Sequence, residues 1–203
     1  GVDQIGAVNT VVIDQDGLLT GYNTDSYGFT TALEQKFPGE LAGSSAVIIG
    51  AGGAVKAVVI GLLAFGVAHI TIANRTLARS QALLQQLPAA AQLICDAVPL
   101  LPECLPLEAC QLLINGSSLG MRGEIITAVD LDRLPDQAVV YDLIYRPAVT
   151  PLLAQSVVRG LRTLNGLGML IHQGARAFAL WTGRTMPVAA VTAHLNTLVD
   201  SHV

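Results

Sequence analysis

The chain has 203 residues, of which 52% are hydrophobic and 13% are charged, and its net charge of −4 gives a pI near 5.4. This acidic balance gives no support to a nucleic-acid-binding surface. Residues 57–68 form an uncharged stretch after Lys56, and these twelve residues fall well short of the roughly 20 that a bilayer span requires.

The three cysteines, Cys95, Cys104 and Cys110, are odd in number and lack the spacing of a metal site. They favour reduced thiols in a cytoplasmic protein that carries no metal. The chain opens at Gly1, with no methionine or signal peptide, in what reads as the interior of a fold. We therefore expect a fragment of a longer protein.

The first elements predicted along the chain are two strands that form a hairpin. Residues 6–13 and 18–22 flank the turn signal Asp16-Gly17, and they read as paired strands. A helix is expected over residues 24–37, because Pro38-Gly39 follows it and ends it.

The rest of the chain alternates between apolar, β-branched runs and helical patterns. Residues 96–109 hold three prolines and read as irregular or as a short helix. The alternation predicts an α/β fold with a doubly wound parallel sheet. The further predicted strands cover residues 47–49, 69–73, 92–95, 111–115, 138–142 and 162–164. The further predicted helices cover residues 55–65, 150–159, 169–181 and 188–199.

A glycine-rich turn separates the apolar run 47–49 from the helical pattern that follows it. The turn residues are Gly50, Ala51, Gly52, Gly53 and Ala54. Glycines at a strand-to-helix turn let backbone N–H groups approach a pyrophosphate, and the helix start attracts the anion. The turn departs from the dinucleotide fingerprint G-x-G-x-x-G, because a valine occupies the place of the third glycine. Taken alone, it also fits a plain strand-to-helix turn.

The next predicted strand ends in Asn74-Arg75-Thr76, with Arg79 one helical turn further on. An NAD-binding protein usually has Asp or Glu at this place, where it holds the ribose hydroxyls. A guanidinium would instead attract a 2′-phosphate, so the sequence predicts NADP rather than NAD. The alternative is that both arginines are solvated residues at a helix start.

Four further motifs follow one another along the chain in an order that is typical of one family. Together with the glycine turn and Asn74-Arg75-Thr76, they closely resemble shikimate dehydrogenase over almost the whole chain. The motifs are Gly6-Ala7-Val8-Asn9-Thr10 with Gly21-Tyr22-Asn23-Thr24-Asp25, Ile114-Asn115-Gly116-Ser117-Ser118-Leu119-Gly120-Met121, Tyr141-Asp142-Leu143-Ile144-Tyr145-Arg146-Pro147 with Thr150-Pro151-Leu152-Leu153, and Asn165-Gly166-Leu167-Gly168-Met169-Leu170 with Gln173-Gly174-Ala175 and Phe178.

The resemblance implies reduction of 3-dehydroshikimate to shikimate with NADPH in aromatic amino-acid biosynthesis. It also implies a Rossmann-like sheet with part of a second α/β substrate domain and the active site between them. Residues 1–25 would be the remnant of the substrate domain, 26–165 the NADP-binding domain, and 166–203 C-terminal helices that return to the substrate domain.

The resemblance also assigns individual residues. Asp25 matches the acidic member of a catalytic Lys–Asp pair. The substrate would be bound by Asn9, Asp25, Tyr145 and Gln173. The cofactor would be bound by Gly50, Ala51, Gly52, Gly53, Ala54, Asn74, Arg75, Thr76, Arg79, Ser117, Leu143 and Gly166.

The lysines depart from the family pattern. The chain contains only Lys36 and Lys56, and neither lies in a context that matches the catalytic lysine. In the family, that lysine and the serines that bind the substrate carboxylate precede the Gly6–Thr10 motif. We therefore expect this chain alone to bind NADP better than it catalyses.

Several interpretations stay open from the sequence. The protein is a shikimate dehydrogenase, a quinate/shikimate dehydrogenase of looser specificity, a non-catalytic NADP-binding fragment or sensor, or less favourably another Rossmann enzyme such as a folate-linked dehydrogenase. Its partners are expected to be small molecules rather than nucleic acid or membrane, and either a monomer or a homodimer is possible.

Some residues also have plainer structural interpretations. Asp25 could serve as a helix N-cap, and Asn9 could be a polar group at a strand edge. Tyr145 could be a half-buried packing residue. Gln173 on an apolar helix favours a functional role. Structural or solvated roles are expected for His69, His172, His194 and His202.

Overall fold

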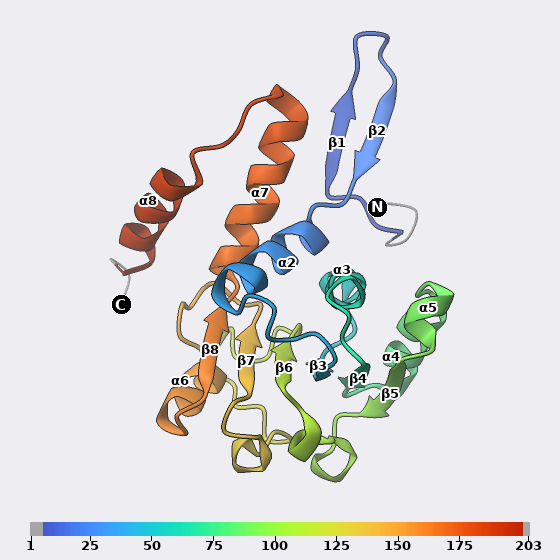
Figure 1. Ribbon diagram of the computed structural model, residues 1–203, viewed down its shortest axis with the longest axis vertical. Coiled ribbons are helices and arrows are strands. Elements are labelled where there is room, and N and C mark those ends of the chain that lie inside the picture. Colours follow the sequence, from blue (N-terminus) through green and yellow to red (C-terminus); the bar gives the residue numbers. More distant parts are fainter. Residues whose placement is uncertain (1–5, 201–203) are drawn as a thin grey trace.

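A six-stranded parallel sheet lies at the centre of the structure, a computed structural model that describes residues 6–200 (Figure 1). The spatial order is β5-β4-β3-β6-β7-β8, and every neighbouring pair is parallel. This confirms the predicted doubly wound sheet. The end residues 1–5 and 201–203, which include His202, lie outside the described residues. The strands are β3 (Ser45–Ile49), β4 (His69–Asn74), β5 (Cys95–Pro99), β6 (Leu112–Asn115), β7 (Val139–Asp142) and β8 (Arg162–Asn165).

The strand order reverses direction at β3. From β3 the chain moves outward to β4 and β5, and it then returns to the other side of β3 with β6. Ile49, the last residue of β3, pairs with Ala73 on one side and with Asn115 on the other. The connections after β3 and β6 therefore lead to opposite faces of the sheet, and such a point is where open α/β sheets bind ligands.

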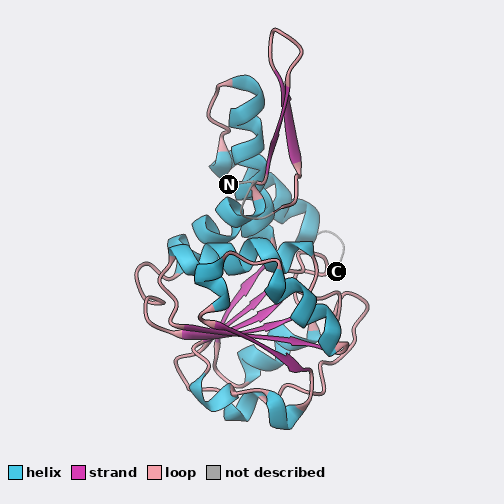
Figure 2. Ribbon diagram, turned by 90° about the vertical axis from the view of Figure 1, so that its right-hand side faces the viewer, coloured by secondary structure: helices cyan, strands magenta, loops and turns pink. Residues whose placement is uncertain are grey.

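Helices cover both faces of the sheet, as the view in Figure 2 shows. Because both faces of the inner strands are buried, these strands are apolar runs: Ile48 of β3 packs into one core, and Val47 and Ile49 pack into the other. One face is covered by α2 (Asp25–Lys36), α3 (Gly53–Ala64), α4 (Leu77–Gln85), α5 (Ala89–Gln92) and α7 (Leu167–Thr182). The other face is covered by α6 (Pro151–Val158) and by segments with the 3₁₀ turns η1 (Pro102–Cys104), η2 (Leu107–Ala109) and η3 (Leu131–Arg133). Helix α8 (Val188–Asp200) follows α7.

The predicted hairpin is formed by β1 (Thr10–Ile13) and β2 (Leu19–Tyr22), which pair antiparallel with Thr10 opposite Tyr22. It projects away from the sheet beside the end of α7 (Figures 1 and 2). The indole Nε1 of Trp181 in α7 donates to the carbonyl of Val11 at 2.9 Å. The hairpin is thus joined to the last turn of α7 across 170 residues of sequence.

Two predicted strands differ from the structure. The strand predicted at residues 92–95 is wrong in position, because Gln92 ends α5 and β5 runs from Cys95 to Pro99. Pairing with β4, which sets Ile70 opposite Cys95, fixes this register. A proline is tolerated there because β5 is an edge strand. The strand predicted from residue 6 begins only at Thr10.

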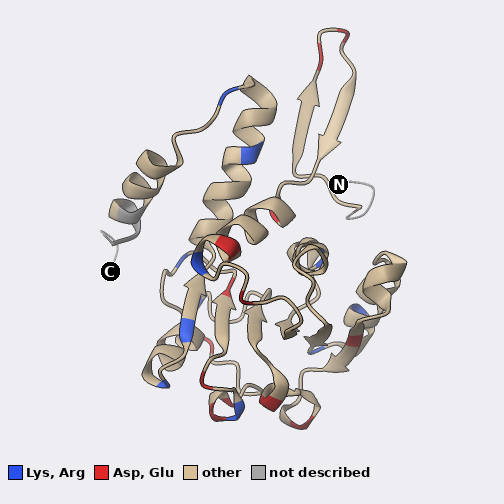
Figure 3. Cartoon of the chain, in the orientation of Figure 1, with Lys and Arg blue, Asp and Glu red and all other residues tan. Residues whose placement is uncertain are grey.

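Charged residues gather in the loops near the amino ends of β6, β7 and β8, in the lower part of Figure 3. Arg133 contacts Glu108 at 2.7 Å, and Arg159 contacts Asp132 at 3.1 Å and Asp136 at 3.0 Å. Exposed pairs of this kind add little stability. Within the described residues, every helix is too short or too polar to traverse a bilayer, and no cluster of side chains is placed to hold a metal ion.

His172 is structural, as expected. The residue is 8% exposed where α7 packs on α2, and its Nε2 lies 3.0 Å from Oε1 of Gln35. In the neutral Nε2–H tautomer this nitrogen donates to the amide oxygen. Burial lowers the pKa of His172 below its ordinary value of 6.5.

The lowered pKa gives a test of this packing. Protonation of His172 favours the unfolded chain, so the folded state loses stability as the pH falls from about 7 to about 5. We expect the free energy of unfolding of the wild type to fall in this window relative to that of His172→Gln, measured by urea denaturation. His69→Gln, which alters a half-exposed histidine, is the control. Parallel curves for wild type and His172→Gln would contradict the prediction.

Candidate functional site

The glycine turn after β3 packs directly against the loop after β6. Gly50 has φ +109°, and a Cβ on it would lie 2.9 Å from the carbonyl carbon and oxygen of Gly116. A side chain here would therefore push the two loops apart. The amide of Gly116 also donates to the carbonyl of Ile49 at 2.8 Å. Glycine at 50 is required by the chain's own packing at the point where the strand order reverses.

Gly52 and Gly53 differ from Gly50, because no atom of a non-neighbouring described residue lies within 4 Å of a Cβ built on either. Gly52 is the N-cap of α3, and the first turn of this helix carries no acidic residue. The positive end of α3 is therefore uncompensated and open to a bound anion. The predicted pyrophosphate contacts of Gly50, Ala51, Gly52, Gly53 and Ala54 stay predictions, which the open helix start supports.

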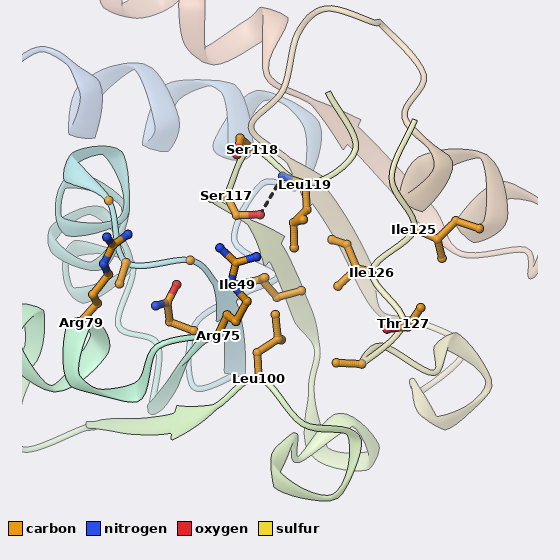
Figure 4. A pocket seen from close by; sticks show the side chains of 16 residues that line it. Ile49, Arg75, Arg79, Leu100, Ser117, Ser118, Leu119, Ile125, Ile126 and Thr127 are labelled. Carbon is orange, nitrogen blue, oxygen red and sulfur yellow. Dashed lines mark hydrogen bonds between the residues drawn. The ribbon is translucent and has the colours of Figure 1, made fainter. Parts of the chain in front are cut away.

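A cavity of about 590 Å³ opens beside the glycine turn. In Figure 4, Arg75 and Arg79 lie on one side of it, and Ile125, Ile126 and Thr127 lie on the opposite side. The lining residues are Ile49, Gly50, Ala51, Gly52, Asn74, Arg75, Arg79, Leu100, Gly116, Ser117, Ser118, Leu119, Ile125, Ile126, Thr127 and Ala128. Sequence reasoning missed Leu100 and residues 125–128, because they belong to irregular segments without a motif.

Arg75 and Arg79 carry the charge of this cavity. Within residues 6–200, neither guanidinium has a carboxylate within 4.0 Å. Asn74 shapes the turn, because its Nδ2 donates to the carbonyl of Thr76 at 2.9 Å. Thr76 is the N-cap of α4 but is absent from the cavity lining, so its predicted contact with the cofactor stays a prediction.

The remaining predicted cofactor residues lie in loops that touch one another. A Cβ on Gly166 would lie 1.9 Å from the carbonyl oxygen of Leu143, so the two backbones are in contact. A Cβ on Gly116 would lie 3.7 Å from Cδ1 of Leu143. The hydroxyl of Ser117, which follows Gly116, donates to Oδ1 of Asn115 at 2.7 Å. The structure therefore brings Ser117, Leu143 and Gly166 to one place.

A second polar cluster joins the hairpin, α2 and α7. The Nδ2 of Asn9 donates to Oδ1 of Asp25 at 2.8 Å and to Oε1 of Gln173 at 3.3 Å. The hydroxyl of Thr24 lies 3.3 Å from Oδ1 of Asn9 and from Oε1 of Gln173. Three of the four predicted substrate residues thus meet, although they lie up to 164 positions apart.

Asp25 is not the helix N-cap that its position suggested. Thr24 is the N-cap of α2, and the amide of Asp25 donates to Oδ1 of Asn23 at 3.0 Å. The carboxylate is therefore free of a capping role. Burial raises the pKa of Asp25, and the hydrogen bond from Asn9 opposes this effect. Such a carboxyl is suited to accept a hydrogen bond from a ligand hydroxyl.

Tyr145, the fourth predicted substrate residue, does not join this cluster within the described residues. The side chain of Tyr145 is 46% exposed, and within the described residues its hydroxyl makes no hydrogen bond, so its role stays a prediction. Neither Lys36 nor Lys56 lies within 4.0 Å of Asp25 in the part of the chain that the structure describes. Lys56 instead approaches Gly6, where a Cβ would lie 3.2 Å from its Nζ.

The fold, the glycine turn and the cavity define a dinucleotide-binding protein of the Rossmann type. The model of the family described as shikimate / quinate 5-dehydrogenase matches residues 31–145, and that of the shikimate 5′-dehydrogenase C-terminal domain matches residues 166–195. The chain belongs to the shikimate / quinate 5-dehydrogenase family.

Individual relatives agree. A protein of Magnetococcus marinus named shikimate dehydrogenase (NADP(+)) is 49% identical over 188 residues, which are 92% of this chain and 66% of the relative. Shikimate 5-dehydrogenase from Listeria monocytogenes, solved with shikimate and NAD, is 33% identical with a TM-score of 0.83, over 96% of this chain and 69% of that one. Quinate dehydrogenase from Corynebacterium glutamicum, solved with NAD, is 34% identical with a TM-score of 0.87. The match covers 97% of this chain and 70% of that one. The chain thus spans about two thirds of the length of these relatives.

The position of Gln173 depends on close packing between α2 and α7. A Cβ on Gly28 would lie 2.5 Å from the carbonyl oxygen of Met169 and 2.8 Å from the amide of Gln173. We expect Gly28→Ala to force the helices apart and to cost about 1–3 kcal/mol of stability. Gly174→Ala is the control, because a Cβ there meets no atom of the other described elements within 4 Å. Thermal denaturation checks both variants, and equal stability of the two would contradict the prediction.

Proposed function

We propose that this chain is part of an NADP-dependent oxidoreductase that interconverts 3-dehydroshikimate and shikimate by hydride transfer. The observation that carries the proposal is the pair of guanidinium groups, Arg75 and Arg79, at the place where NAD-binding sheets carry a carboxylate. The name of the Magnetococcus marinus relative, shikimate dehydrogenase (NADP(+)), supports both the reaction and the cofactor.

The cofactor would lie across the carboxyl edge of the sheet. The 2′-phosphate would contact Arg75 and Arg79, and the pyrophosphate would contact the open backbone of Gly52 and Gly53 at the start of α3. The nicotinamide end would then reach the loops of Ser117, Leu143 and Gly166. The empty space over Gly52 and Gly53, which the chain's own packing leaves free, fits a phosphate.

The substrate would bind at the cluster of Asn9, Asp25 and Gln173. Shikimate carries hydroxyl groups, and carboxylate and amide side chains are suitable partners for hydroxyls. The Lys–Asp pair implied by the family assigns Asp25 to the proton transfer. The bound cofactor supplies the hydride, and this chain's residues orient the ring so that donor and acceptor carbons meet.

Two finer assignments belong to the same proposal. We assign residues 1–25 and 166–203 to the substrate side of the cleft and residues 26–165 to the cofactor side. We also place the protein in the cytoplasm, because the cysteines are free and burial raises the pKa of Cys95 and Cys110 to about 12, which keeps them as thiols. Small molecules are its proposed ligands, and it is a monomer or a homodimer.

A quinate dehydrogenase is the second candidate. The similarity to the Corynebacterium glutamicum enzyme, at 34% identity, favours it. That protein was solved with NAD, whereas this chain carries the arginine pair. A non-catalytic NADP-binding fragment or sensor is the third candidate, because no lysine of the described residues contacts Asp25.

The cofactor choice is tested by removing one guanidinium. We expect Arg75→Ala to weaken NADP⁺ binding roughly 10- to 100-fold, because the variant loses a charge-assisted hydrogen bond to the 2′-phosphate. We expect NAD⁺ binding to be unchanged, because NAD⁺ lacks this phosphate. Isothermal titration calorimetry measures both. Arg184→Ala, which alters an exposed arginine outside the cavity, is the control. Unchanged preference for NADP⁺ in Arg75→Ala would falsify the assignment.

The reaction is tested by turnover. We expect shikimate-dependent NADPH formation, faster than with quinate or NAD⁺, when this chain is extended at its N-terminus to the length of its relatives. Asp25→Asn should lower kcat about 10²- to 10⁴-fold, as loss of a proton-transfer group does. Asp16→Asn, at the exposed hairpin tip, is the matched control. Intact NADP⁺ binding without turnover would favour the sensor, and faster turnover of quinate would favour the quinate enzyme.

A further inference from the structure

Three neighbouring strands end in the same kind of residue. Asn115, Asp142 and Asn165 are the last residues of β6, β7 and β8, and they are paired across the sheet. The side-chain oxygen of each accepts the amide of the residue two positions on. These contacts are Ser117 N to Asn115 at 3.1 Å, Ile144 N to Asp142 at 3.0 Å, and Leu167 N to Asn165 at 3.2 Å. Each side chain therefore fixes the direction in which its loop leaves the sheet.

Asp142 differs from the other two, because it joins separate segments. Its Oδ1 accepts from Nδ2 of Asn115 at 3.0 Å, and its Oδ2 accepts from the hydroxyl of Thr150 at 2.6 Å. Thr150 is the N-cap of α6, and its hydroxyl accepts from the amide of Leu153 at 3.3 Å. One carboxylate thus connects the end of β6, its own loop and the start of α6.

The network continues into the loop that lines the cavity. Nδ2 of Asn115 also donates to the carbonyl of Leu119 at 2.8 Å, and Oδ1 of Asn115 accepts from the hydroxyl of Ser117. Ser117 and Leu119 line the cavity, across from Arg79 in Figure 4. On the other side of Asp142, Leu143 contacts the backbone of Gly166. The carboxylate therefore anchors the loops that face the nicotinamide end of the proposed cofactor position.

The burial of this carboxylate is costly. Asp142 is 0% exposed, and within the described residues no Lys, Arg or His side chain lies within 4.0 Å of it. Neutral donors alone compensate the charge, and burial raises the pKa of Asp142. An apolar side chain would avoid this cost but could not accept these hydrogen bonds, so the contribution of the carboxylate is the loop geometry that it imposes.

We propose that Asp142 is a positioning residue that holds the Ser117–Leu119 and Leu143–Ile144 segments in the arrangement that receives the nicotinamide half of the cofactor. The inference rests on the proposed function. It requires that Asp142 contributes to binding of the nicotinamide half and not to binding of the adenosine half, which in the proposed position would contact Arg75 and Arg79 on the other side of the cavity.

Calorimetry with two ligands tests the proposal. NADPH contains both halves, whereas adenosine 2′,5′-bisphosphate contains only the adenosine half. We expect Asp142→Ala to weaken NADPH at least about 10-fold, as for loss of a buried hydrogen-bonded group, and to leave the bisphosphate within about 2-fold of the wild type. Asp136→Asn, which alters an exposed carboxylate near the amino end of β7, should change neither the affinity for NADPH nor that for the bisphosphate.

Two variants at Thr150 keep the test decisive if Asp142→Ala does not fold. Thr150→Val removes the donor to Asp142 and should weaken NADPH selectively, whereas Thr150→Ser retains the hydroxyl and should restore wild-type affinity. Unchanged NADPH affinity in the folded variants overturns the proposal, and so does a parallel loss of both ligands. A wild type that binds neither ligand overturns the proposed function as well. A wild type that binds both, with insensitive variants, overturns the positioning role alone.

Discussion

The close approach of loop backbones at the carboxyl edge of the sheet is the constraint on which the candidate site depends. Gly50 lies against Gly116, and Gly166 lies against Leu143, at distances that leave no room for a Cβ. Because the strand order reverses between β3 and β6, the loops diverge just beyond these contacts, and the cavity forms there. Glycine is therefore a packing requirement at positions 50 and 166, whereas at 52 and 53 it keeps space open for a ligand.

Two carboxyl groups near this edge, those of Asp142 and Asp25, lack a cationic partner in the described residues and have different roles. Asp142 is enclosed and bonded to three neutral donors, so it can only hold other groups in place. Asp25 has its side-chain hydrogen bond from Asn9 and stays accessible, so it is available to a ligand. Desolvation raises the pKa of both. Burial of a carboxyl group thus accompanies a positioning role at Asp142 and, in our proposal, a role in proton transfer at Asp25.

Much of the sheet could be predicted, because its inner strands β3, β4, β6 and β7 are buried on both faces and read as apolar runs. The prediction failed at β5, whose register is set by pairing with β4 rather than by its own sequence. The Asn115–Asp142–Thr150 network was not predicted as a unit, although each residue lay in a quoted motif. A polar residue at the end of an apolar strand run was the signal that could have found it.

The sequence by itself determined the alternation of strands and helices, the glycine turn and the arginine pair, because burial, backbone freedom and charge act over a few neighbouring residues. Only the tertiary structure decided which side chains meet. Asn9 and Gln173 lie 164 positions apart, and Asn115 and Asp142 lie 27 apart. Such contacts follow from strand register and from the packing of α2 on α7, where the absence of a side chain at Gly28 sets the spacing. No local preference encodes that spacing.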